Sequence, residues 1–153
     1  MLKIGDKYLF EVSYADRQSC LMFFKEDDSS SWSLDIGFCE GEFGDETVAP
    51  AICINPIDTD KNSVEELVGE RFEVTTVKEC DEREDTFYIF ESEPMVSYEV
   101  EVLEIKDSKA RIRCSGIMIV DGYSDPYEEE KFEIDCLVPI IESASDWAKF
   151  ENL

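Results

Sequence analysis

Apolar and polar side chains alternate along most of this chain, and this period of two constrains the fold more than any other feature of the sequence. In the segment SWSLDIGF, one face carries Trp32, Leu34, Ile36 and Phe38, while serine, aspartate and glycine lie on the other. Successive side chains of a β-strand point to opposite faces of the sheet. The alternation is therefore typical of strands that bury one face.

Eight or nine strands with short connections are predicted by this alternation. The segments are KYLFEVSY, SCLMFFK, SWSLDIGF, VAPAICINP, RFEVTTVKEC, DTFYIFES, MVSYEVEVLEI, KARIRCSGIMIV and KFEIDCLVPII. Asp107 and Ser108 form a dipeptide that favours a tight turn between two of them. Because helical patterns are few, we expect a mainly β fold, either an antiparallel β-sandwich or a partly open barrel.

Two short helices are expected beside the strands. Ser63 is followed three residues later by Glu66, a capping-box pattern that predicts an internal helix over residues 64–68. The tail ESASDWAKFENL predicts a C-terminal helix from about Asp146, with its two aromatic residues on one face.

The whole chain, residues 1–153, is expected to form a single domain. A chain of this length can bury a substantial core, and its 43% hydrophobic residues argue against disorder. No stretch rich in proline, glycine or serine divides the sequence into two parts.

The charge of the chain is strongly one-sided, with 38 Asp and Glu against 14 Lys and Arg and a formal net charge of −24. Proteins bind nucleic acid and anionic membranes through basic side chains, so neither is expected as a partner. A protein of this charge is instead attracted to basic proteins.

The residues that most enzymes use are missing from the sequence. There is no histidine, which removes Ser-His and Cys-His nucleophilic pairs and every zinc site that needs imidazole. The seven glycines never have the spacing of a phosphate-binding loop. We therefore expect a protein that is not an enzyme and that holds no cofactor.

The six cysteines include no C-x-x-C pair, and most lie inside apolar strand segments. This pattern favours reduced thiols that pack as small hydrophobic groups. The opening segment MLKIGDKYLFEV lacks the apolar run of a signal peptide, and no run of eighteen apolar residues occurs. The expected location is the cytoplasm.

One segment resembles a calcium loop in part. Asp58, Asp60 and Asn62 occupy the first, third and fifth positions of such a loop. The sixth position is Ser63 instead of glycine, and the twelfth is Gly69 instead of a bidentate glutamate. No metal site is therefore predicted, although weak cation binding by the first three residues is left open.

Two acidic segments are predicted to bind a partner. The first, CDEREDTFYIFESE, encloses an apolar strand between carboxylates, which also protects such strands from edge pairing. Its predicted partner-binding residues are Glu79, Asp81, Glu82, Glu84 and Asp85.

The second segment, VDGYSDPYEEEKFE, has turn signals at Asp-Gly and Asp-Pro that place its two tyrosines in a loop. Tyrosine next to carboxylates suits a basic protein surface, although loop tyrosines also pack on their own domain. The predicted partner-binding residues are Tyr123, Asp125, Tyr127, Glu128, Glu129 and Glu130.

These features favour a small binding protein for a basic partner. The character of the chain, small, acidic, mainly β and without histidine, is similar to that of bacterial immunity proteins as a group. That resemblance implies an inhibitor that neutralises a basic toxin, such as a nuclease, whose cleft is lined with Lys and Arg. The alternatives are a β-barrel that binds a small ligand and a structural subunit that pairs through a strand edge.

Overall fold

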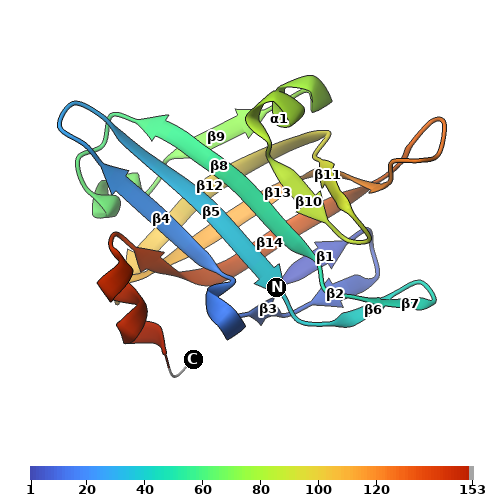
Figure 1. Ribbon diagram of the computed structural model, residues 1–153, viewed down its shortest axis with the longest axis horizontal. Coiled ribbons are helices and arrows are strands. Elements are labelled where there is room, and N and C mark those ends of the chain that lie inside the picture. The colour runs from blue at the N-terminus through green and yellow to red at the C-terminus, as the bar shows by residue number, and fades with distance from the viewer. Residues whose placement is uncertain (152–153) are drawn as a thin grey trace.

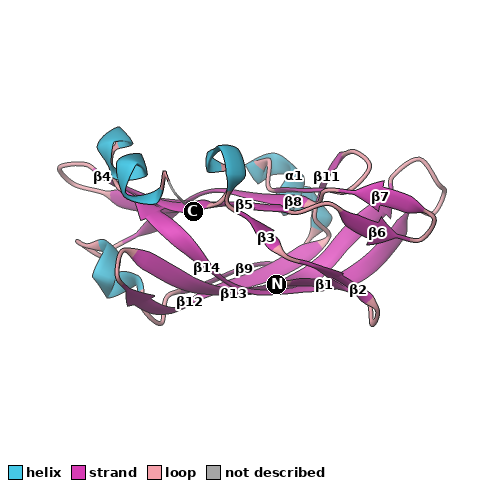
Figure 2. Ribbon diagram, turned by 90° about the horizontal axis from the view of Figure 1, so that it is seen from below, coloured by secondary structure: helices cyan, strands magenta, loops and turns pink. Residues whose placement is uncertain are grey.

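The structure, a computed structural model, describes residues 1–151 and is built mainly from strands. Figure 2 shows them in two stacked layers. The 14 strands are β1 (Leu2–Ile4), β2 (Tyr8–Phe10), β3 (Val12–Ser13), β4 (Cys20–Lys25), β5 (Ser30–Phe38), β6 (Gly41–Phe43), β7 (Glu46–Val48), β8 (Ala51–Thr59), β9 (Arg71–Val74), β10 (Thr86–Tyr88), β11 (Ser92–Pro94), β12 (Ser97–Lys106), β13 (Lys109–Asp121) and β14 (Glu128–Ile141).

Within residues 1–151, three short helical segments lie between strands and a fourth follows β14. One is an α-helix, α1 (Val77–Arg83), and three are 3-10 helices: η1 (Ala15–Arg17), η2 (Val64–Leu67) and η3 (Ala144–Phe150). No helix within residues 1–151 is both long enough and apolar enough to cross a membrane.

The two layers share one long strand, β14. The first layer has the order β11-β10-β8-β5-β4, with β3 also on β5. The second has the order β9-β12-β13-β14-β1-β2. The last two residues of β14, Ile140 and Ile141, pair in parallel with β4, whereas the other strand pairs are antiparallel. The fold is therefore a sandwich joined along one side, and the strand order ends at β11 and β9 without closing a barrel.

The core lies between the layers and follows the predicted alternation. Trp32, Leu34, Ile36 and Phe38 of β5 are all buried, as the sequence predicts. Phe87 of β10 and Phe132 of β14 meet across the core with ring centroids 5.0 Å apart. Burial of these large rings removes much apolar surface from water, which is the main force that holds two sheets together.

The prediction of eight or nine strands is wrong, since the structure has 14. KYLFEVSY is divided into β2 and β3 at Glu11, and the β6–β7 hairpin lies in a part of the chain for which no strand was predicted. RFEVTTVKEC is a strand only as far as Val74. Thr76 then begins α1, because its side-chain oxygen accepts a hydrogen bond from the Glu79 backbone N–H at 3.2 Å.

The two predicted helices exist, but both are 3-10 helices. At η2, Ser63 makes no side-chain capping bond, and Glu66 instead accepts a bond from the Asn62 backbone N–H at 3.2 Å. At η3, the Asp146 carboxylate accepts the Ser143 backbone N–H at 3.1 Å, as the acidic residue of a capping box does. The predicted Asp107-Ser108 turn is confirmed, with φ of 55° and 61° at its two residues.

Candidate functional site

The outward face of the second layer is almost neutral, because positive and negative side chains alternate across its strands. Arg111 and Asp135 are paired there at 2.9 Å, and Arg71 contacts Glu99. The basic side chains of this face are Lys3, Arg71, Lys106, Lys109, Arg111, Arg113 and Lys131. The acidic ones are Glu73, Glu99, Glu101, Glu104, Glu133 and Asp135. With seven positive charges against six negative ones, this face holds none of the surplus negative charge.

Three long stretches of the chain contain acidic but no basic residues. No Lys or Arg occurs between Lys25 and Lys61, between Arg83 and Lys106, or between Arg113 and Lys131. The fold brings the last two stretches together at one end of the molecule, where the hairpin between β13 and β14 projects beyond the layers (Figure 1). The Tyr123 hydroxyl donates a hydrogen bond to Glu91 at 3.2 Å and so joins the two stretches.

We call this end the hairpin surface. Its acidic and aromatic residues are Phe90, Glu91, Glu93, Asp121, Tyr123, Asp125, Tyr127, Glu128, Glu129 and Glu130. Within residues 1–151, none of its carboxylates forms an ion pair. All six residues predicted from the second acidic segment belong to it, and all six are exposed.

Tyr123 is the most exposed aromatic side chain of the hairpin surface, at 82% of its full accessible area. Asp121 holds the loop below it by accepting bonds from the Tyr123 backbone N–H and the Ser124 hydroxyl, both at 2.9 Å. These bonds stabilise the carboxylate and lower the pKa of Asp121. The Glu91 carboxylate, in turn, raises the pKa of Tyr123. The ring is thus presented to solvent on a loop that is locally fixed.

Glu91 and Glu93 belong to the hairpin surface although they were not predicted as partner-binding residues. A Cβ atom on Gly122 would lie only 2.6 Å from a carboxylate oxygen of Glu93, so this part of the hairpin loop packs closely against the end of the Glu93 side chain. The signal in the sequence was the pair of acids that follows the FYIF strand. Local patterning did not show that a hairpin thirty residues later would lie beside them.

Four of the five residues predicted in the first acidic segment lie on or next to α1 instead of in a loop. Glu79, Asp81, Glu82 and Glu84 are exposed there, and Glu82 lies 3.9 Å from Lys78. β11 lies between α1 and the β13–β14 hairpin in Figure 1, so the two predicted acidic patches are separate.

Asp85, the fifth of these residues, is fully buried and does not belong to a binding surface. One carboxylate oxygen accepts the Asn55 backbone N–H at 2.8 Å. The other accepts Arg83 Nε at 2.7 Å and the Tyr98 hydroxyl. Burial, together with the Asp85 carboxylate, raises the pKa of Tyr98, so this hydroxyl keeps its proton as a donor.

The Asp85 cluster connects the two layers. Arg83 Nη2 donates to the backbone oxygen of Asn55 on β8 at 2.8 Å, and its guanidinium lies 4.8 Å from the ring centre of Phe72 on β9. Tyr98 belongs to β12. The cluster therefore ties the first layer to the second near the side where the sandwich is open, which is a structural role.

The calcium-like segment is not arranged as a loop. Asp58 lies within β8, and Asp60 pairs with Lys61 at 3.9 Å on the surface. The six cysteines are free thiols, of which Cys20, Cys80, Cys114 and Cys136 are buried. No group of three or more carboxylate or cysteine side chains that could hold a metal occurs in residues 1–151.

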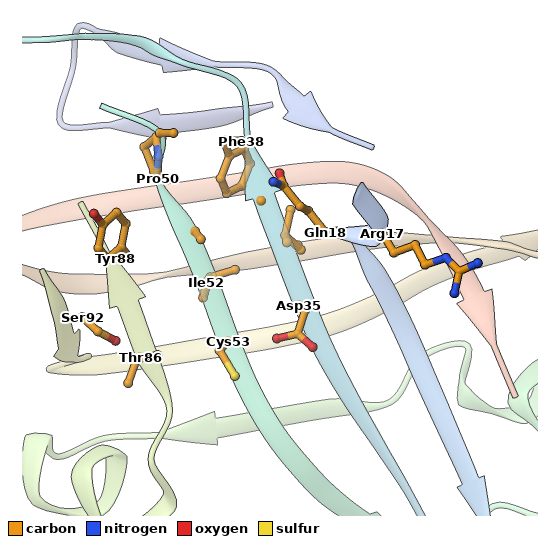
Figure 3. A pocket seen from close by; sticks show the side chains of 14 residues that line it. Arg17, Gln18, Asp35, Phe38, Pro50, Ile52, Cys53, Thr86, Tyr88 and Ser92 are labelled. Atoms are coloured by element: carbon orange, nitrogen blue, oxygen red, sulfur yellow. The ribbon is translucent and has the colours of Figure 1, made fainter. Parts of the chain in front are cut away.

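A second candidate surface lies on the outward face of the first layer. A groove of about 470 Å³ crosses this face, between Arg17 and Gln18 on one side and Thr86, Tyr88 and Ser92 on the other (Figure 3). Its floor is formed by outward residues of β5 and β8, among them Asp35 and Cys53.

Neither models of protein families nor curated proteins nor solved structures gave a match to this chain.

Proposed function

We propose that this chain is a non-enzymatic acidic binding protein, an immunity-type inhibitor that neutralises a basic toxin in the cytoplasm by binding it. The observation that carries the proposal is Tyr123, which is 82% exposed among carboxylates that have no basic partner within residues 1–151. Tyrosine is enriched among the residues that dominate binding energy, and unpaired carboxylates attract a cationic surface.

A nuclease is the toxin that fits this surface best. Its substrate is a polyanion, so its cleft must expose Lys and Arg side chains. A protein with a net charge of −24 approaches such a cleft faster than diffusion alone allows, and fast capture protects the cell that makes the toxin. In this proposal the hairpin surface steers the approach, and Tyr123 with Tyr127 supplies buried contacts in the complex.

The two alternatives have less support. Pairing through a strand edge needs a long, accessible edge, but the edge strands β2 and β11 have three residues each, β9 has four, and β11 ends at Pro94. Binding inside a barrel needs an internal space, whereas Trp32, Phe87 and Phe132 fill the region between the layers.

The direct test is to titrate this protein into a purified basic nuclease toxin whose gene lies beside its own. We expect DNA cleavage to fall linearly and to stop at one equivalent. Tyr123→Ala should weaken inhibition by at least about tenfold, because it removes an anchor residue. Leu137→Ala, which shortens a half-exposed side chain on the second layer, is the matched control and should leave inhibition unchanged. Undiminished cleavage at excess inhibitor contradicts the proposal.

A further inference from the structure

The outward face of the first layer differs from that of the second in that it carries almost no charge. Strand register places two rows of side chains across it, in line from β11 to β4 or β5. One row consists of Pro94, Thr86, Cys53, Asp35 and Cys20. The other consists of Ser92, Tyr88, Ala51 and Gly37. Asp35 is the one charged residue in these rows, and most of the others are small, so the face is open.

Asp35 lies between two thiols at the centre of this face. Its cross-strand neighbours are Cys20 on β4 and Cys53 on β8, and Figure 3 shows the side chains of Asp35 and Cys53 next to each other. Burial and the Asp35 carboxylate raise the pKa of Cys20 to about 11 and that of Cys53 to about 12. Both thiols are therefore neutral at physiological pH, and they leave the negative charge of Asp35 uncompensated.

Arg17, the basic residue that lines the groove, does not neutralise Asp35. Arg17 is turned away from it in Figure 3, and its guanidinium lies 5.4 Å from the ring centre of Trp147 on η3. The next residue, Gln18, packs over Gly37, since a Cβ atom on Gly37 would lie 2.8 Å from the Gln18 side-chain oxygen. Within residues 1–151, Asp35 takes part in no ion pair.

We propose that this groove is a docking site for a segment of the partner protein that carries an arginine or lysine side chain, with Asp35 as the carboxylate that receives it. The inference rests on the proposed function, because the partner is the basic protein that the hairpin surface attracts. Charge complementarity identifies the occupant: a half-buried, unpaired carboxylate in an acidic protein selects a cationic side chain.

The shape of the face favours a protein segment over a small free cation. Sites for small ligands bury most of the ligand surface, whereas this groove is an open strip along the sheet. Half-exposed Tyr88 lies beside it, and half-exposed Phe24 lies further along the same face. A centre poor in charge with aromatic residues at its margin is the composition of a protein–protein interface.

The test is an NMR titration of the ¹⁵N-labelled chain with a short capped peptide that has one arginine between glycine and serine residues. We expect shifts of the Gly37, Cys53 and Thr86 amides. The same peptide with citrulline, which is neutral, should leave these amides unshifted. Asp35→Asn should weaken peptide binding by about tenfold. Glu101→Gln, which removes one charge from the second layer, is the matched control and should have no effect.

Two further arms make the outcome decisive. Ala51→Phe fills the groove without a change of charge and should also abolish the shifts. If arginine amide alone binds as tightly as the peptide, the groove is a small-cation site and the docking inference is overturned. If the peptide shifts only the amides of residues 121–130, the inference that the groove is the docking site is overturned, but the proposed function stands. If the peptide shifts neither region and the toxin titration also fails, both are overturned.

Discussion

At the scale of single residues, burial separates carboxylates that look alike in the sequence. Glu84 and Asp85 are neighbours in the same acidic segment, but Glu84 is exposed at the end of α1 and Asp85 is fully buried. Asp85 accepts bonds from Asn55, Arg83 and Tyr98 and so satisfies donors from both layers. A buried charge is tolerated only when it is paired and hydrogen-bonded in this way.

Asp85→Asn should lower the free energy of unfolding by about 3 kcal/mol, because it leaves the partly buried Arg83 without its counter-charge and removes an acceptor. Urea unfolding measures this loss. Glu84→Gln neutralises the adjacent exposed carboxylate and should change stability by less than about 0.5 kcal/mol. Equal, small effects for both variants would show that the cluster does not hold the layers together.

At the scale of elements, the sequence predicted strands where alternation is strong and failed where tertiary contacts decide. The buried face of β5 was predicted residue by residue, because the period of two is a local property. α1 was missed because its sequence, VKECDER, follows a strand without a break and buries only Cys80. Its local signal was Thr76 followed three residues later by Glu79, a capping-box pattern that lay hidden inside a strand-like run.

The candidate site, like the strands, was predictable only where local sequence signals determine the structure. The loop position of Tyr123 and Tyr127 followed from turn residues, and the structure places both on the surface. The contribution of Glu91 and the burial of Asp85 depend on which strands become neighbours, and pairing order cannot be read from alternation. The groove around Asp35 arises for the same reason, because β5 pairs with β8 and β8 pairs with β10 although other elements separate them in the sequence.

At the scale of the whole molecule, the buried thiols make stability depend on pH. Burial raises the pKa of Cys20, Cys80 and Cys136 from 9.0 to about 11. In the unfolded chain these thiols lose their protons near pH 9, whereas in the folded chain they keep them. Their contribution to stability is therefore complete below pH 9 and is lost as the pH rises toward 11.

The free energy of unfolding, measured in urea with a reductant, should accordingly fall between about pH 9 and about pH 11. Cys136→Ala removes one of the titrating thiols and should make this fall less steep. Cys39→Ala, at an exposed position, should leave the slope unchanged. A pH-independent free energy in this range would show that the thiols are not held protonated by the fold.

Charge is distributed unevenly over the molecule. The outward face of the second layer is balanced, whereas the hairpin surface is acidic and forms no ion pairs in the described part of the chain. We predict that the position of the acids determines binding, and that net charge alone does not. Two triple variants that change the net charge equally separate these possibilities. One reverses Glu128, Glu129 and Glu130 to lysine, and the other reverses Glu73, Glu101 and Glu133.

The most direct test is the stopped-flow association rate of each variant with the basic toxin at low ionic strength, after melting curves confirm that both variants fold. The hairpin variant should associate at least about tenfold more slowly than the unmodified chain, and high salt should largely remove the difference. The second-layer variant should associate within about twofold of the unmodified rate. Equal slowing of both variants would contradict a localised binding surface.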